Sequence, residues 1–187
     1  MQQATHTTGT LALEQLDTPI GTLFIVTDTL GVVHAIDWAD DAGPRLESRS
    51  WDSLPLPGRA GHSPARRALA KYFEGDVRAI DSLATATAGT WFQQATWRTL
   101  RRIRAGAPWT YGTLASEIGR PRAVRAAGRA AGANPIAIVV PCHRVIGARG
   151  ALTGYRGGLA RKRWLLRWEA DVTRARLEHR AAADSLA

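Results

Sequence analysis

The heptapeptide PCHRVIG, residues 141–147, holds the single cysteine of the chain, Cys142, with His143 directly after it. A thiol with an ordinary pKa of about 8.5 is only slightly ionised at neutral pH, so a nucleophilic cysteine needs a base such as an imidazole. Adjacent residues usually point in different directions, and many lone cysteines are simply packed in a core. Residue types alone therefore leave Cys142 open as a nucleophile, a metal ligand or a packing residue.

A histidine that serves a nucleophile is commonly oriented by a carboxylate. Glu169 is the nearest downstream carboxylate within an apolar helical pattern, and Asp171 follows it. Between cysteine and carboxylate, residues 147–158 read GARGALTGYRGG, a glycine-rich stretch that can bring backbone amides close to a ligand. These residues are candidates for a reactive site, although a glutamate late in a helix is usually solvated.

Metal and cofactor chemistry finds little support in the sequence. The five histidines are scattered and show no metal-ligand spacing with one another or with carboxylates. One cysteine can neither form an intramolecular disulfide nor anchor a cysteine-rich zinc site, and it agrees with a reducing compartment. We therefore expect no metal and no cofactor.

Composition bears on location and partner. No run approaches the roughly 18 apolar residues that cross a bilayer, and the N-terminus lacks the pattern of a secretory signal, so we expect a cytoplasmic protein with no membrane partner. The chain has 25 lysines and arginines against 16 acidic residues, a net charge of +9. Such an excess favours binding to nucleic acid, because basic side chains release counterions from phosphates. A basic solvated surface would give the same count.

The pattern of turn residues predicts an α+β fold that begins with a small β-sheet. Residues 9–37 alternate short apolar runs with turn signals, as in a β-meander, and residues 39–64 are rich in proline, glycine and serine and predict a loop. A helix is expected over 65–75, with Ser63 as its N-cap, Pro64 at its first position and Gly75 at its end.

Helices dominate the second half. A helix over 91–106 would direct Phe92, Trp97, Leu100 and Ile103 towards a core. The apolar run 136–140 predicts a short buried strand, and a last helix over 159–170 would end near Glu169. We expect an N-terminal domain over residues 1–86, a mainly helical C-terminal domain over 87–170 and a polar tail over 171–187.

A helix-turn-helix is predicted just before the cysteine. A short helix over 113–119 would close at Gly119, and Pro121 would open a second helix whose Arg122, Arg125 and Arg129 share one face. Small residues, among them Ala126 and Ala131, give this helix a slim profile that could approach a nucleic acid closely or pack tightly against a neighbouring helix. One short region thus combines a thiol, a histidine, a glycine-rich loop and a helix-turn-helix. This combination favours a reactive cysteine in a DNA-binding protein.

The chain resembles the O6-alkylguanine-DNA alkyltransferases, also called methylated-DNA-protein-cysteine methyltransferases. The resemblance rests on PCHRVIG, on TGYRGGLARKRWLLRWE after it, and on TYGTLASEIGRP and RAAGRAAGANPIAIVV before it. It covers residues 90–169 closely, and TPIGTLFIVTD is similar to the family's N-terminal β domain. It implies a monomer that can assemble cooperatively on double-stranded DNA. This protein would transfer the alkyl group of O6-alkylguanine, and of O4-alkylthymine, to its own cysteine once per molecule.

The resemblance also implies roles for single residues. Cys142 would accept the alkyl group, His143 would draw off the thiol proton through a water, and Glu169 would orient the histidine. Asn134 would tie the recognition helix to the active-site strand. The DNA-side residues would be Tyr111, which helps rotate the nucleotide and protonates the departing guanine; Arg125, which fills the gap in the base stack; Tyr155, Arg156 and Gly157, in the loop that closes over the base; and Ala126 and Ala131, on a helix lying in the minor groove.

Two positions depart from the family's pattern. Arg156 stands where relatives usually have a small or hydroxyl residue, which puts a side-chain hydrogen bond to the alkylated oxygen in doubt and changes the entrance to the pocket. Ala137 stands where some relatives carry a proline that lines the pocket. A roomier pocket that accepts bulkier alkyl groups is the corresponding hypothesis.

Three other functions are compatible with parts of the sequence. A DNA-binding regulator with a redox- or alkyl-sensing thiol would need readable base contacts, yet the second helix offers mainly alanine and glycine. An alkyltransferase-like lesion binder would lack the cysteine, which is present. A cysteine hydrolase would leave the DNA-directed features without a role.

Overall fold

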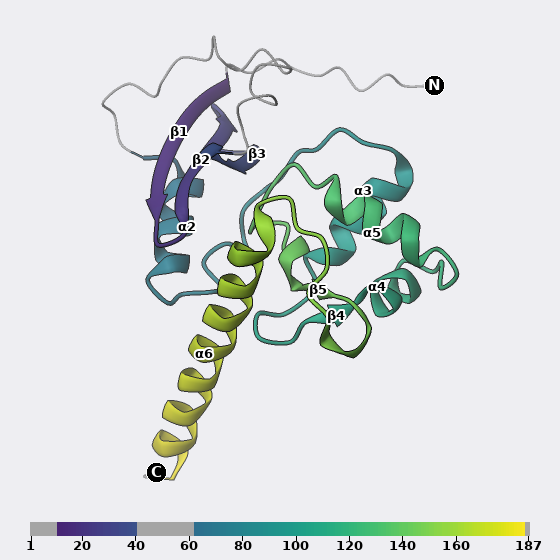
Figure 1. Ribbon diagram of the computed structural model, residues 1–187. Helices are drawn as coiled ribbons and strands as arrows, with labels where there is room; N and C mark the ends of the chain where they lie inside the picture. Colours follow the sequence, from purple (N-terminus) through teal and green to yellow (C-terminus); the bar gives the residue numbers. More distant parts are fainter. Residues whose placement is uncertain (1–10, 41–61, 186–187) are drawn as a thin grey trace.

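The computed structural model describes residues 11–40 and 62–185. A three-stranded antiparallel sheet, in the order β1-β2-β3, opens the fold (Figure 1). Its strands are β1 (Leu11–Thr18), β2 (Gly21–Asp28) and β3 (Val33–Trp38). The predicted β-meander is confirmed, whereas most of the predicted loop over 39–64 lies outside the described residues.

Helix α2 (Pro64–Phe73) packs against this sheet and buries Leu69 and Tyr72. The predicted start is confirmed: the Ser63 side chain accepts a hydrogen bond from the Arg66 amide, and proline occupies the first helical position. The helix ends just before Gly75, whose φ of +107° lies in the region that favours glycine.

Helices α3 (Trp91–Leu100), α4 (Tyr111–Glu117) and α5 (Val124–Gly132) form a second group, in which α5 packs against both α3 and α4 (Figure 1). The helix predicted over 91–106 is shorter than expected. After Leu100 the chain continues through tight turns, in which the amide of Ile103 donates to the carbonyl of Leu100. These turns still bring Ile103 into the core, where it is 1% exposed.

The predicted helix-turn-helix is present, but its second helix starts later than expected. The amide of Ala123 donates to the carbonyl of Arg120 at 2.8 Å and closes a turn that contains Pro121 and Arg122. Proline favours such a turn because its φ is fixed at the value that the second turn position needs. Arg122 therefore lies before α5, and the prediction that it shares a helix face with Arg125 and Arg129 is wrong.

The apolar run 136–140 is buried as predicted, but it is not a strand. Only Ile136 makes a bridge, to Ile36 of β3, and the following residues curl into turns. The side chain of Asn134 causes this: its amide donates to the carbonyls of Ile136 and Val140, and its oxygen accepts from the amide of Ile136. These local bonds take the place of a strand ladder.

The chain then passes through a 3-10 turn (Cys142–Arg144), the short strand β5 (Val145–Ile146) and a second 3-10 turn (Ala148–Gly150). Strand β5 pairs in parallel with β4 (Trp109–Thr110), which leads directly into α4. This pairing holds the start of α4 next to the segment that carries the cysteine.

Helix α6 (Gly158–Asp184) is much longer than the predicted helix over 159–170, and Figure 1 shows it extending away from the rest of the chain. Residues 171–184 contain no proline or glycine that would stop it. Ion pairs from Arg174 to Asp171 and from Arg180 to Asp184 support its exposed end. The tail is polar as predicted, but the helix does not end near Glu169. Within the described ranges, no helix is long and apolar enough to span a bilayer.

Candidate active site

Cys142 follows the turn that Asn134 organises. The side-chain nitrogen Nδ2 of Asn134 lies 3.3 Å from the Cys142 sulfur and 2.7 Å from the carbonyl oxygen of Val140. Asn134 is 2% exposed and sits two residues after the last residue of α5. One buried side-chain amide thus links the segment after the second helix of the helix-turn-helix to the thiol, although the residues that it bonds form turns and not the predicted strand.

The thiol opens onto a pocket of about 290 Å³. The predicted residues that line it are Tyr111, Ala131, Asn134, Cys142, Tyr155, Arg156 and Gly157, and Ala137 lines it too. Arg125 and Ala126 are not among the lining residues; on α5, Arg125 is exposed and Ala126 is half-buried. The pocket also includes Asp37 and Trp38 of β3, which the sequence analysis did not single out.

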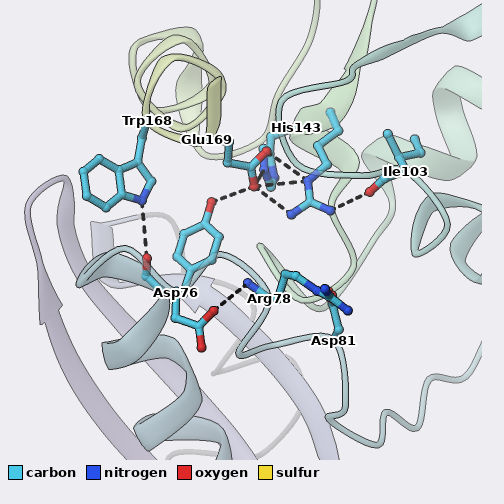
Figure 2. A network of polar contacts seen from close by, with 9 residues as sticks. Asp76, Arg78, Asp81, Ile103, His143, Trp168 and Glu169 are labelled. Atoms are coloured by element: carbon cyan, nitrogen blue, oxygen red, sulfur yellow. Dashed lines mark hydrogen bonds and ion pairs between the residues drawn. The ribbon is translucent and has the colours of Figure 1, made fainter. Parts of the chain in front are cut away.

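Behind the pocket, Glu169 of α6 receives hydrogen bonds from three directions (Figure 2). His143 Nε2 lies 3.0 Å from its Oε1, and the Tyr72 hydroxyl donates to the same oxygen at 2.8 Å. Arg144 reaches both carboxylate oxygens through Nε and also donates from Nη2 to Oε1 at 2.8 Å. Its third nitrogen, Nη1, donates to the carbonyl of Ile103 at 2.6 Å. We call Tyr72, His143, Arg144 and Glu169 the carboxylate hub.

The charges of the hub fix the tautomer of His143. Burial raises the pKa of Glu169, but His143 and Arg144 together outweigh burial and hold it at about 2. Burial lowers the pKa of His143 against the opposing effect of Glu169, so the imidazole is neutral near pH 7 and Arg144 supplies the balancing charge. Because Glu169 can only accept, His143 Nε2 carries the proton and Nδ1 keeps its lone pair. No described protein group bonds to Nδ1, which is buried.

The thiol is protonated in the resting site. Burial raises the pKa of Cys142, although the hydrogen bond from Asn134 and the charge of Lys162 both act to lower it. A thiol of this kind reacts only when a base removes its proton as the new bond forms. A neutral His143 with an unprotonated Nδ1 has the protonation state of such a base.

Lys162 is a buried site residue that the sequence analysis missed. Its Nζ donates to the carbonyls of Thr153 and Gly154 in the glycine-rich loop and lies 5.8 Å from the centre of the Tyr111 ring. Burial lowers its pKa. A sequence signal existed, because Lys162, Leu165 and Glu169 follow the three- and four-residue spacing of one helix face, and all three are fully buried.

Tyr111 is the first residue of α4, which Thr110 caps. Its hydroxyl lies 3.4 Å from the carbonyl oxygen of Thr153, and its ring packs 3.6 Å from the position that a Cβ would take at Gly128 of α5. Burial raises the pKa of Tyr111, so the hydroxyl is a proton donor at neutral pH. Tyr111 therefore stands between the helix-turn-helix and the thiol pocket.

Sequence comparison connects this site with known proteins. A family model described as 6-O-methylguanine DNA methyltransferase, DNA binding domain, matches residues 91–171. A methylated-DNA–protein-cysteine methyltransferase of Salmonella typhimurium is 46% identical over 164 residues, which cover 83% of this chain and 94% of the relative. A protein of the same name from Haemophilus influenzae is 40% identical over 151 residues, or 81% of this chain and 82% of the relative.

Structure comparison finds similar proteins of known structure. The crystal structure of an O6-methylguanine methyltransferase from Mycobacterium tuberculosis has a TM-score of 0.70 at 38% identity, covering 86% of this chain and 93% of that one. The M. tuberculosis protein OGT in complex with DNA has a TM-score of 0.72 at 37% identity, with coverages of 86% and 94%.

Proposed function

Since the chain belongs to the methylated-DNA–protein-cysteine methyltransferase family, we propose that it repairs DNA by transferring the alkyl group of O6-alkylguanine to Cys142. The observation that carries this proposal is a single thiol open to a pocket, backed by a neutral histidine that a buried carboxylate orients. O4-alkylthymine, which presents an alkylated oxygen in a similar place, is the second substrate that we propose.

The reaction is a displacement at the alkyl carbon. The Cys142 sulfur forms a bond to that carbon while the bond to the guanine O6 breaks, and the thiol proton passes through a water to His143 Nδ1. The departing guanine takes a proton, for which the Tyr111 hydroxyl is the proposed donor. The thioether product is a very poor leaving group, so each molecule reacts once, without a cofactor.

The thiol in the pocket can react only with a base that has left the DNA double helix. An O6-alkyl group lies inside the duplex, where a thiol in a pocket cannot reach it, so the nucleotide must swing out at a cost of a few kcal/mol. We propose that α5 enters the minor groove, where its small residues allow close approach. Arg125, exposed on α5, would fill the gap left in the base stack.

The loop from Tyr155 to Gly157 is the proposed cover of the flipped base. Its residues line the pocket together with Asn134 and Ala131, and its backbone amides would donate to the alkylated oxygen. We propose that the protein acts as a monomer in the cytoplasm and could bind cooperatively along double-stranded DNA.

Repair of a blocked restriction site tests the transfer. A duplex with O6-methylguanine in the recognition sequence should become cleavable after incubation, in proportion to the protein added and up to one lesion per molecule. Cys142→Ser should restore no cleavage. Continued turnover beyond one lesion per molecule, or restoration by the serine variant, would contradict the proposal.

The pH dependence of the rate tests the base. Because the pKa of His143 lies below its ordinary value, the unprotonated base dominates at pH 7, and the rate should stay flat down to about pH 6.5. With His143→Gln the rate should be much lower and should rise with pH, since thiolate must then form without the base. A wild-type rate that rises steadily through pH 7 to 9 would argue against His143 as the base.

A further inference from the structure

The N-terminal sheet reaches the alkyl pocket through the end of β3. Asp37 and Trp38 line the pocket together with the loop residues Tyr155, Arg156 and Gly157. Asp37 Oδ2 lies 3.0 Å from Arg156 Nη2, and the two side chains are only 11% and 25% exposed. An ion pair shielded to this degree is screened by salt less than one on the open surface.

The neighbouring residues add a tight packing contact. A Cβ at Gly157 would lie 2.3 Å from Trp38 Nε1, so the loop backbone rests directly on the indole. Arg161 of α6 stacks on the same indole, with its guanidinium carbon 4.6 Å from the ring centre, and donates to the carbonyl of Gly157. The sheet therefore holds the loop by packing at Gly157 and by charge at Arg156.

Among the described residues, the guanidinium of Arg156 makes few polar contacts. Its Nε and Nη1 are buried and make no hydrogen bond with any described residue. Because buried donors without partners are destabilising, this position of Arg156 depends on the carboxylate of Asp37. Loss of that carboxylate should release the Arg156 side chain, while Trp38 and Arg161 still hold the loop backbone at Gly157.

Building on the proposed function, we propose that the Asp37–Arg156 pair sets the size of alkyl group that the site accepts. Arg156 is the specificity-determining residue, because its side chain forms part of the pocket wall. Asp37 is a positioning residue that acts through Arg156. Ala137 lines the same pocket, and we expect a bulky group to fit beside it when Arg156 moves aside.

The test compares transfer rates from duplexes that carry O6-methylguanine or O6-benzylguanine. Arg156→Ser should raise the benzyl-to-methyl rate ratio about tenfold, the scale on which pocket walls discriminate between groups that differ in size. Asp37→Asn, which removes the charge and keeps the shape, should raise the ratio by a smaller factor. Adding Asp37→Asn to Arg156→Ser should change the ratio no further, because Asp37 affects the ratio through its contact with Arg156.

Asp76→Asn is the matched control, since Asp76 pairs with Arg176 at the same 3.0 Å distance but outside the pocket lining. It should leave the ratio unchanged. The proposal fails if Arg156→Ser leaves the ratio within about twofold of wild type, or if Asp37→Asn lowers both rates equally, as a general loss of structure would. Wild-type protein that transfers neither group would instead refute the proposed function.

Discussion

Two polar networks join the N-terminal half of the chain to the active site, and they differ in how completely their donors are used. In the carboxylate hub, all three guanidinium nitrogens of Arg144 bond to protein oxygens, and Tyr72 of α2 and His143 complete the set around Glu169. In the Asp37–Arg156 pair, one nitrogen of Arg156 meets a carboxylate and the other two are buried without a bond among the described residues.

The difference matches the roles that we propose for the two networks. A base works only in one orientation and one tautomer, so a fully bonded carboxylate beneath His143 suits it. The cover that we propose for the flipped base must be able to move, so a guanidinium with one ionic contact among the described residues suits the pocket entrance. Substitutions in the hub should therefore affect stability, whereas substitutions at the pair should affect selectivity.

The largest effect is expected from Arg144→Ala. It leaves Glu169 buried without the guanidinium that bonds both of its oxygens. Breaking a buried pair in this way typically costs about 3–5 kcal/mol, so we expect about that loss in the free energy of unfolding. Urea denaturation at pH 7 measures it. A loss below about 1 kcal/mol would mean that the hub is not a rigid support.

Acid should remove the contribution of Glu169. Its pKa in the folded protein, about 2, lies below the ordinary value of 4.5, so the stabilisation is present above about pH 4.5 and disappears as the pH falls through 2. The shift corresponds to about 3 kcal/mol. Urea titrations between pH 7 and pH 2 should show this decline in wild type and a smaller decline in Glu169→Gln. Equal declines would contradict the assignment.

Tyr72→Phe should have an intermediate effect. It removes one hydrogen bond to a carboxylate that keeps Arg144 and His143, so we expect a loss of about 1–2 kcal/mol in unfolding free energy. The transfer rate should change by less than about threefold, because the histidine keeps its partner. Thermal unfolding and single-turnover kinetics on the same samples separate the two. A large rate loss would show that Tyr72 positions the base itself.

Arg156→Ser should have the smallest effect on stability. The ion pair that it removes is partly solvated, and the substitution also removes two buried donors without partners, so the change should stay within about 1 kcal/mol. Thermal denaturation beside Arg144→Ala gives the direct contrast. A loss as large as that of Arg144→Ala would remove the distinction between the two networks.

The sequence predicted those parts of the fold that depend on local signals. The N-cap Ser63, the following proline and Gly75 bounded α2 correctly because each acts on its own backbone. The run 136–140 was mistaken for a strand because the bonds that curl it come from one side chain, Asn134, in a conformation that composition does not reveal. The exposed end of α6 is rich in charged residues and shows no apolar periodicity, so the sequence predicts a helix that is too short.

The site was predicted in part, because its local motifs can be read from the sequence and its long-range contacts cannot. Motif residues such as Cys142, Tyr111 and Tyr155 meet at one pocket, as the resemblance implied. Arg156 was recognised as a departure, but its partner Asp37 lies more than a hundred residues earlier, and only the fold brings the two together. Lys162 could have been found from its spacing to Glu169, whereas nothing local identified Asp37.

One measurement tests the central claim most directly. The protein is incubated with an excess of duplex DNA containing O6-methylguanine, digested, and analysed by peptide mass spectrometry. The account predicts one added methyl group on the peptide that carries Cys142, in nearly every molecule, and none with unmodified DNA. An unmodified Cys142 after complete exposure to the substrate, or a methyl group on another residue, would contradict it.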